Sequence, residues 1–156
     1  MQDNFDHDSD EDSGDGDLSD LLSELRILLP GAQMLTAFLI ILPFNGGFAK
    51  IVQAEKVVFL ATFFLSMTSL VLLSAPAIQH RIMRPLKDRE RFKRVADRIM
   101  MAGALTLAFA FVLGTNLVIS EVFGHLAGIV ACTIMAVLII VMWWVMPRYL
   151  KRRTSI

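Results

Sequence analysis

The residues of this chain that could do chemistry are few, and two of them stand four positions apart. Glu121 and His125 lie in a short polar stretch between two apolar runs. If one helix continues through this stretch, the carboxylate and the imidazole share a face of that helix. Such a pair could bind a cation or relay a proton, because histidine changes its charge near neutral pH. The alternative is an exposed pair that only ends the helix.

A second group of polar side chains interrupts the apolar runs themselves. Gln33 and Asn116 carry amides, and Ser66 and Ser69 carry hydroxyls. An unpaired amide in hydrocarbon is costly, so both amides should face another helix or water. Two interpretations stay open. These side chains either form hydrogen bonds between helices, or line a narrow polar path for ions that ends at the Glu/His pair.

Four long apolar runs must position these residues. They cover residues 27–44, 57–78, 99–119 and 126–146, and none of them contains Asp, Glu, Lys, Arg or His. About 20 apolar residues, rising 1.5 Å each, cross the ~30 Å hydrocarbon core of a bilayer. The runs also lack the polar face that a soluble helix shows every 3.6 residues. The sequence therefore predicts an all-α integral membrane protein, a four-helix bundle of two antiparallel transmembrane hairpins.

The formal net charge of zero hides a steep segregation of charge. Ten of the 15 acidic residues fall in the first 24 positions, whereas the loop 79–98 holds eight of the 15 Lys and Arg residues and the tail 148–156 holds four. Together with Arg26, these basic residues lie on one side of the membrane, and only Lys50 and Lys56 lie on the other. The positive-inside rule then places both termini and the loop in the cytoplasm.

The basic residues directly flank the apolar runs, which is typical of segments that attract anionic lipid headgroups. We expect a bilayer with anionic headgroups to bind Arg84, Lys87, Arg91, Arg94, Lys151 and Arg152. Nucleic acid is a poor competitor, because only Phe92 is placed to stack a base. The loop is predicted to be helical after Pro85 and to extend the third span into the cytoplasm.

The N-terminal part divides into two segments. Residues 1–17 form an acidic tail with too little apolar surface to fold, and residues 18–156 form the transmembrane domain. Leucines at helical spacing over residues 18–29 predict an amphipathic helix at the membrane interface. Pro30 follows, and a proline there is expected to bend the helix as it enters the membrane.

A polar cluster is predicted near the cytoplasmic face. Glu24 and Arg26 lie just before Pro30, and His80 and Arg81 lie just after the proline of the second run. A carboxylate beside Arg and His is stabilised in its charged form. We favour a structural clamp that fixes the interfacial helix to the end of the second span. The alternative is a gate or a site that senses protons or anions.

Small residues recur along the third and fourth runs at intervals of four. Ala102, Ala110 and Gly114 lie in the third run, and Gly124 and Gly128 lie at the start of the fourth. Such ridges let helix backbones approach closely, either within a hairpin or between subunits. We therefore expect close helix packing. A homo-oligomer is expected for a different reason, because four short helices alone enclose hardly any pore.

Several short motifs resemble those of a bacterial family of small four-helix membrane proteins. The matching residues are Glu24-Leu25-Arg26, Leu29-Pro30-Gly31, Gln33, Phe38, Pro43-Phe44, Ala75-Pro76 and His80-Arg81. The function of this family is unknown, although some members carry an automated sodium:proton antiporter label. The resemblance implies a four-helix fold in the bacterial plasma membrane. It also implies one cytoplasm-facing polar cluster made of Glu24, Arg26, Gln33, His80 and Arg81.

The sequence narrows the function to two classes. It contains no phosphate-binding glycine loop, metal-ligand spacing, Ser/His/Asp set or CxxC pair, so we expect no enzyme, no cofactor and no metal site. The first class is a homo-oligomeric channel or transporter for monovalent cations or protons, which we slightly favour. The second is a non-transporting adaptor that binds lipids or a partner protein. No charged residue lies near the bilayer centre, which weakens any ion-coupled pump.

Overall fold

The computed structural model describes residues 23, 25–44, 46–47, 52–82 and 89–154, with the backbone alone at His80, 89–90 and 153–154. These residues are helical except at Val52, Gly124 and the turn 46–47, and they contain no strand. Four apolar helices are long enough to cross a membrane: Leu25–Phe44, Gln53–Gln79, Arg91–Phe123 and His125–Arg152. The predicted all-α four-helix membrane bundle is confirmed.

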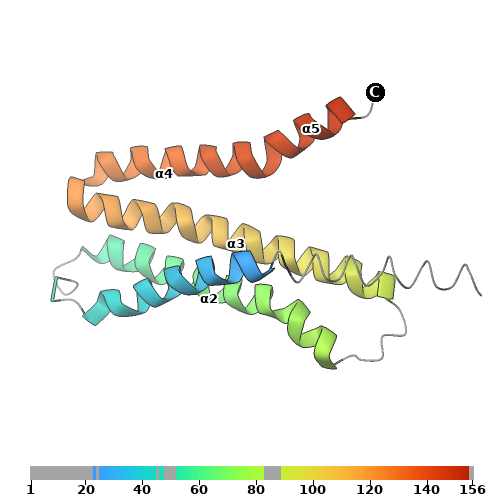
Figure 1. Ribbon diagram of the computed structural model, residues 1–156. Coiled ribbons are helices and arrows are strands. Elements are labelled where there is room, and N and C mark those ends of the chain that lie inside the picture. The colour runs from blue at the N-terminus through green and yellow to red at the C-terminus, as the bar shows by residue number, and fades with distance from the viewer. Residues whose placement is uncertain (1–22, 24, 45, 48–51, 83–88, 155–156) are drawn as a thin grey trace, which may run out of the picture.

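The helices run back and forth along one direction (Figure 1). The first helix, residues 25–41, ends in the 3-10 turn η1 (Leu42–Phe44). The next two are α2 (Gln53–Ile82) and α3 (Arg89–Phe123). The last is one long helix with three parts: α4 (His125–Ile140), the π-helical turn η3 (Val141–Val145) and α5 (Met146–Thr154).

The helices extend beyond the apolar runs at the end where α3 begins. The 35 residues of α3 cover about 52 Å at 1.5 Å per residue, well beyond the ~30 Å hydrocarbon core. The prediction that the third span continues into a helical part of the basic loop is confirmed from Arg89 onward. Helix α2 likewise runs past Pro76 to Ile82.

The first helix passes through Pro30 and Gly31 without a break. Leu25, near the end of the predicted interfacial helix, is buried in one apolar cluster with Phe92 and Ala96 of α3. Residues 25–29 therefore belong to the packed bundle. Residues 18–22 and Glu24, which complete the predicted interfacial helix together with Ser23, lie outside the described residues, as does the acidic tail.

The first helix, α2 and α3 share a common core. Leu39, Leu73 and Leu107, one from each helix, are almost completely buried, and Leu73 and Leu107 belong to the same cluster as Leu25. Gly103 allows α2 and α3 to approach closely, because a Cβ atom there would lie 3.0 Å from the Leu73 side chain. Close contact between backbones is the main source of packing energy for helices in lipid.

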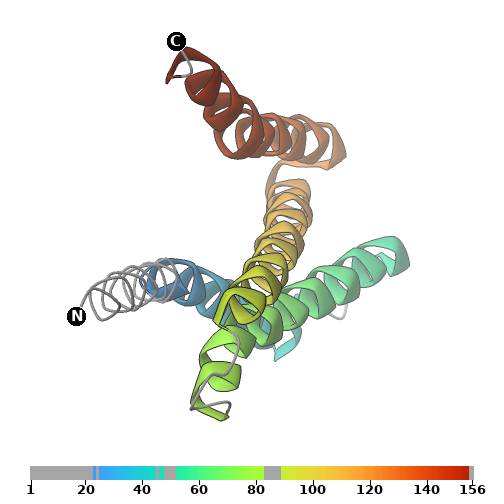
Figure 2. The same cartoon turned by 90° about the vertical axis from the view of Figure 1, so that its right-hand side faces the viewer.

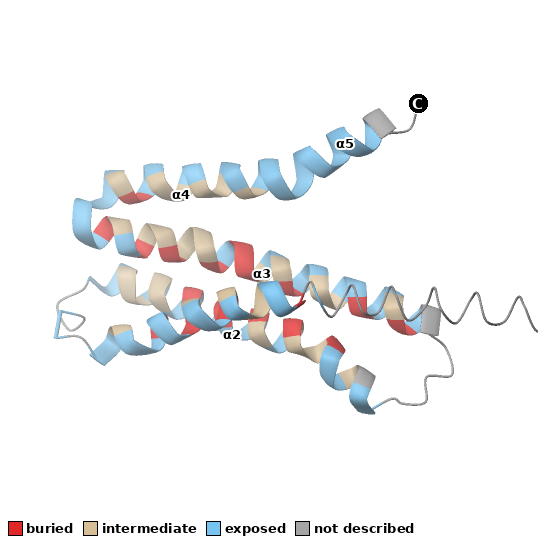
Figure 3. Cartoon of the chain, in the orientation of Figure 1, coloured by how far each residue is buried: buried red, intermediate tan, exposed pale blue. Residues whose placement is uncertain are grey.

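Helix α4 is packed differently from the other three. Among the helices from α2 to α5 it contacts α3 and its own continuation η3, and Gly128 is its buried residue. Figure 2 shows α4 standing apart from the first helix and α2, and Figure 3 shows that α4 consists mainly of exposed and half-buried residues. An apolar helix of this kind is stable in a bilayer, because lipid tails cover its exposed side chains.

The π-helical turn near the end of the chain has a local cause. The N–H of Met146 donates to the carbonyl of Val141, five residues earlier. Pro147 comes next and has no N–H to donate, so the regular hydrogen-bond ladder is interrupted at this point. The extra residue in the turn contributes to the direction in which α5 leaves α4.

Candidate functional site

The two ends of the bundle hold its charged side chains, and the end at which α2 and α4 begin contains a pair that joins distant parts of the chain. His125 Nε2 lies 3.9 Å from Glu55 Oε1, and the Glu55 side chain is only 15% exposed. Val52 accepts the Glu55 N–H at 3.0 Å and so closes the first turn of α2. Sequence reasoning missed Glu55, because 70 positions separate it from its partner.

The condition for a Glu121–His125 pair on one helix, that the helix continues through this stretch, is not met. Helix α3 ends at Phe123, and Gly124 has a φ of +91°, so no helix continues from Glu121 to His125. A positive φ is strained for residues with a Cβ atom, which is why a glycine ends α3 here. The break turns His125 towards α2 and leaves Glu121 exposed.

Directly after this break, α3 and α4 approach very closely. A Cβ atom at Gly128 would lie 2.9 Å from Ser120 Cβ and 3.2 Å from the carbonyl oxygen of Asn116. Further along the helices, Asn116 Nδ2 donates to Cys132 Sγ at 3.7 Å. The Asn116 amide thus contacts another helix, as one of the two interpretations of the sequence expected.

The hydroxyls of Ser66 and Ser69 lie inside the bundle. Ser66 Oγ is hydrogen-bonded to Thr36 Oγ1 of the first helix, and Ser69 Oγ donates to the Gly103 carbonyl of α3 at 3.0 Å. Ser66 and Ser69 have no exposed surface. Among the described residues, every buried side-chain nitrogen or oxygen has a hydrogen-bond partner. The two serine hydroxyls therefore serve contacts between helices.

Gln33 does not join the other polar residues of the spans. Its side chain is exposed on the outer surface of the first helix. Asn116 and the two serines lie instead at helix contacts. A single subunit consequently does not bring the six predicted path residues into one continuous line.

The small-residue ridges are partly displaced from their predicted register. Ala110 and Gly114 are buried, and a Cβ atom at Gly114 would touch Leu35 of the first helix at 3.6 Å. Ala102, in contrast, is exposed, and its neighbour Gly103 makes the contact with α2. Ala102 faces away from α2 because a strict interval of four drifts around a helix of 3.6 residues per turn, and its predicted role in packing between subunits stays a prediction.

The predicted cytoplasmic cluster lies largely outside the described residues. Glu24 and the His80 side chain belong to that part, whereas Arg26 and Arg81 are exposed. The clamp of Glu24, Arg26, His80 and Arg81 therefore stays a prediction.

The basic residues of the two long helices are displayed on the surface. Arg91, Arg94, Lys151 and Arg152 are exposed, while Arg84 and Lys87 lie outside the described residues. The Arg148 guanidinium carbon lies 5.8 Å from the centre of the Trp144 ring, within cation–π distance. Phe92, the one residue considered for stacking on a base, is buried in the apolar cluster.

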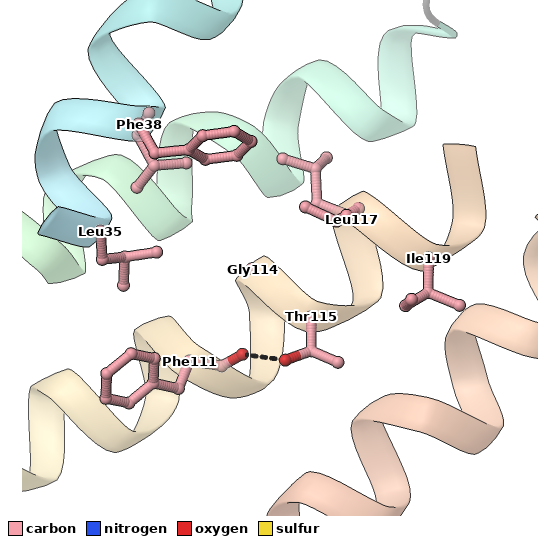
Figure 4. Close-up of a pocket in the computed structure, with 9 residues that line it drawn as sticks. Leu35, Phe38, Phe111, Gly114, Thr115, Leu117 and Ile119 are labelled. Atoms are coloured by element: carbon pink, nitrogen blue, oxygen red, sulfur yellow. Dashed lines mark hydrogen bonds between the residues drawn. The ribbon is translucent and has the colours of Figure 1, made fainter. Parts of the chain in front are cut away.

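An apolar pocket of about 320 Å³ lies between the first helix and α3 (Figure 4). Leu35 and Phe38 line it from the first helix, and Phe111 and Thr115 line it from α3. The Thr115 hydroxyl already donates to the Phe111 carbonyl at 2.7 Å. The pocket thus offers a ligand an almost entirely apolar lining. Among the described residues, no three His, Cys, Asp or Glu side chains gather to hold a metal ion.

Comparison with known proteins identifies the family. Residues 7–147 of the chain match DUF6328, a family of unknown function. The chain belongs to this family. No curated protein and no solved structure matches the chain. The resemblance to a family of small membrane proteins of unknown function is thereby confirmed. Membership of this family does not assign an activity to the chain.

Proposed function

We propose that this DUF6328 protein is a non-transporting adaptor of the bacterial plasma membrane, with both termini in the cytoplasm, which binds anionic lipid headgroups through its basic helix ends. One observation carries the proposal: the serines expected to line a path are used for helix contacts inside the bundle. Ser66 is bonded to Thr36, and Ser69 is bonded to Gly103. The charged groups that stay accessible among the described residues lie towards the helix ends.

The basic end of the last helix supports lipid binding. Its exposed cations include Arg148, Lys151 and Arg152, and no Asp or Glu follows Glu121 in the sequence. Within the described elements α5 contacts only η3, so no other helix of α2 to α5 supplies a counter-charge. Anionic headgroups attract each nearby basic residue by about 1 kcal/mol.

The two tryptophans of the chain, Trp143 and Trp144, provide a direct test because they precede the basic residues. The full chain is reconstituted into vesicles with equal fractions of brominated phosphatidylglycerol or brominated phosphatidylcholine. We expect stronger tryptophan quenching by the anionic lipid, and loss of this preference at high salt, because salt screens the attraction.

Matched variants assign the effect to residues. Combined replacement Arg148→Gln, Lys151→Gln and Arg152→Gln should abolish the preference. Lys56→Gln, at the opposite end of the bundle, should preserve it. Equal quenching by both lipids in the unmodified protein contradicts the lipid-binding proposal.

A homo-oligomeric channel or transporter for protons or monovalent cations is the second candidate. The exposed Gln33 favours it, because an amide facing lipid is costly and a second subunit or a water-filled path would cover it. The path would then lie between subunits, with Glu121 in an outer ring. Ion flux into proteoliposomes separates the candidates. Flux that falls in Gln33→Leu and Glu121→Gln favours conduction, and no flux under any gradient favours the adaptor.

A further inference from the structure

Glu55 is a largely buried carboxylate at the start of a helix. It lies in the first turn of α2, where the positive end of the helix dipole stabilises a negative charge. A side chain that is only 15% exposed also needs a partner for its charge. Among the described residues, His125 Nε2 lies within ion-pair distance at 3.9 Å; its side chain is 76% exposed and is a cation only when the imidazole is protonated.

His125 lies at the point where the last helix begins. It is the first residue of α4 and follows Gly124, where φ is +91° and the helix is interrupted. From this point α4, η3 and α5 extend for about 45 Å at 1.5 Å per residue. Because α4 packs on α3 but not on α2, the Glu55–His125 pair is a side-chain link between α2 and the last helix.

We propose that Glu55 and His125 form a proton-binding site that controls the position of α4 relative to α2. When the imidazole is protonated, the ion pair holds the start of α4 against α2. When the proton leaves, the attraction between opposite charges is lost, and α4 is free to turn about Gly124. A rotation of about 10° there moves the far end of the helix by about 8 Å, given its length.

The charged residues next to Glu55 and His125 do not change the assignment of these two residues as partners. Lys56 follows Glu55 on α2, and Glu121 lies on α3 before the break. Within the described part of the chain, neither forms an ion pair with Glu55 or His125. Lys50 lies outside the described residues. The N-terminal dipole of α4 opposes a positive charge on His125, and this opposition weakens the ion pair.

The test measures the distance between α2 and the last helix in the full chain. Spin labels are attached at Ile78 of α2 and Val145 of η3, both exposed, in a Cys132→Ala background. Pulsed electron resonance in lipid nanodiscs then gives distance distributions at pH 5 and pH 8.5, because histidine changes charge between these values. We expect the ratio of near to far populations to fall about two- to fivefold at pH 8.5, the range of a partly exposed ion pair.

Three variants decide the interpretation. Glu55→Gln should give the pH 8.5 distribution at both pH values, and His125→Lys, a permanent cation, should give the pH 5 distribution at both. Glu121→Gln, which changes the neighbouring carboxylate, should keep the full response. A pH-independent distance in the background protein, or a response that survives in Glu55→Gln, overturns the proposal. Failure of the lipid-quenching or flux experiments leaves it unaffected, because the site lies at the other end of α4 and needs neither activity.

Discussion

The three-helix core and the last helix are both apolar enough to cross a membrane, but they differ in how much of their surface packs within the protein. In α3, 33% of the most apolar window is buried within the protein, but in the last helix only 6% is buried. The core brings backbones together through Gly103 and hydroxyl hydrogen bonds. The last helix relies on one close contact near its start and otherwise on lipid.

This difference shows where rigidity and motion should be sought. Helices in lipid gain little from hydrophobicity alone, so their association depends on packing and hydrogen bonds. The core has both of these along its length, whereas α4 has them mainly around Gly128 and Asn116. We therefore expect the core to carry the stability of the fold, and α4 to be the element that changes position.

The largest contrast should come from the same leucine truncation in the two regions. Leu73→Ala leaves a cavity in the core, since Leu73 is completely buried, and should lower the free energy of unfolding by about 2–5 kcal/mol. Leu138→Ala on α4, where the side chain is 55% exposed, should change it by less than about 0.5 kcal/mol. Unfolding in bicelles measures both. Similar losses would mean that α4 is packed as tightly as the core.

An identical change at two glycines should act in opposite directions. Gly128→Ala places a methyl group against Ser120 and Asn116 and should cost about 1–3 kcal/mol of stability. It should also increase the labelling rate of Cys132 by a lipid-soluble thiol reagent. Gly31→Ala meets nothing within 4 Å and should stabilise the first helix by up to about 1 kcal/mol. Unchanged Cys132 labelling in Gly128→Ala would argue against the single close contact.

The smallest effect concerns the hydrogen bond between the first helix and α2. A double-mutant cycle with Thr36→Val and Ser66→Ala should give a coupling free energy of about 0.6–1.7 kcal/mol, the range for such bonds in membranes. Thr133 bonds to its own helix, so a cycle that pairs Thr36→Val with Thr133→Val should give no coupling. Coupling in this second cycle would indicate that α4 contacts the core.

Much of the fold could be predicted from the sequence, but the candidate site could not. Length and uninterrupted hydrophobicity predict four spans, because lipid imposes one strong constraint on every segment. The sequence left open whether one helix continues from Glu121 to His125, because the positive φ of Gly124 depends on how α3 and α4 pack. Ala102 and Gly103 differ by one position, and only the helix contact distinguishes them.

The sequence by itself determined the spans and the segregation of charge, because both follow from the free energy of moving side chains between water and lipid. The tertiary structure decided which polar groups meet. Glu55 and His125 are 70 positions apart, and no periodicity within either helix relates them. Their contact depends on the break at Gly124 and on the close approach at Gly128, which together direct α4 along α3. Such contacts arise from packing between distant segments, which a local pattern does not encode.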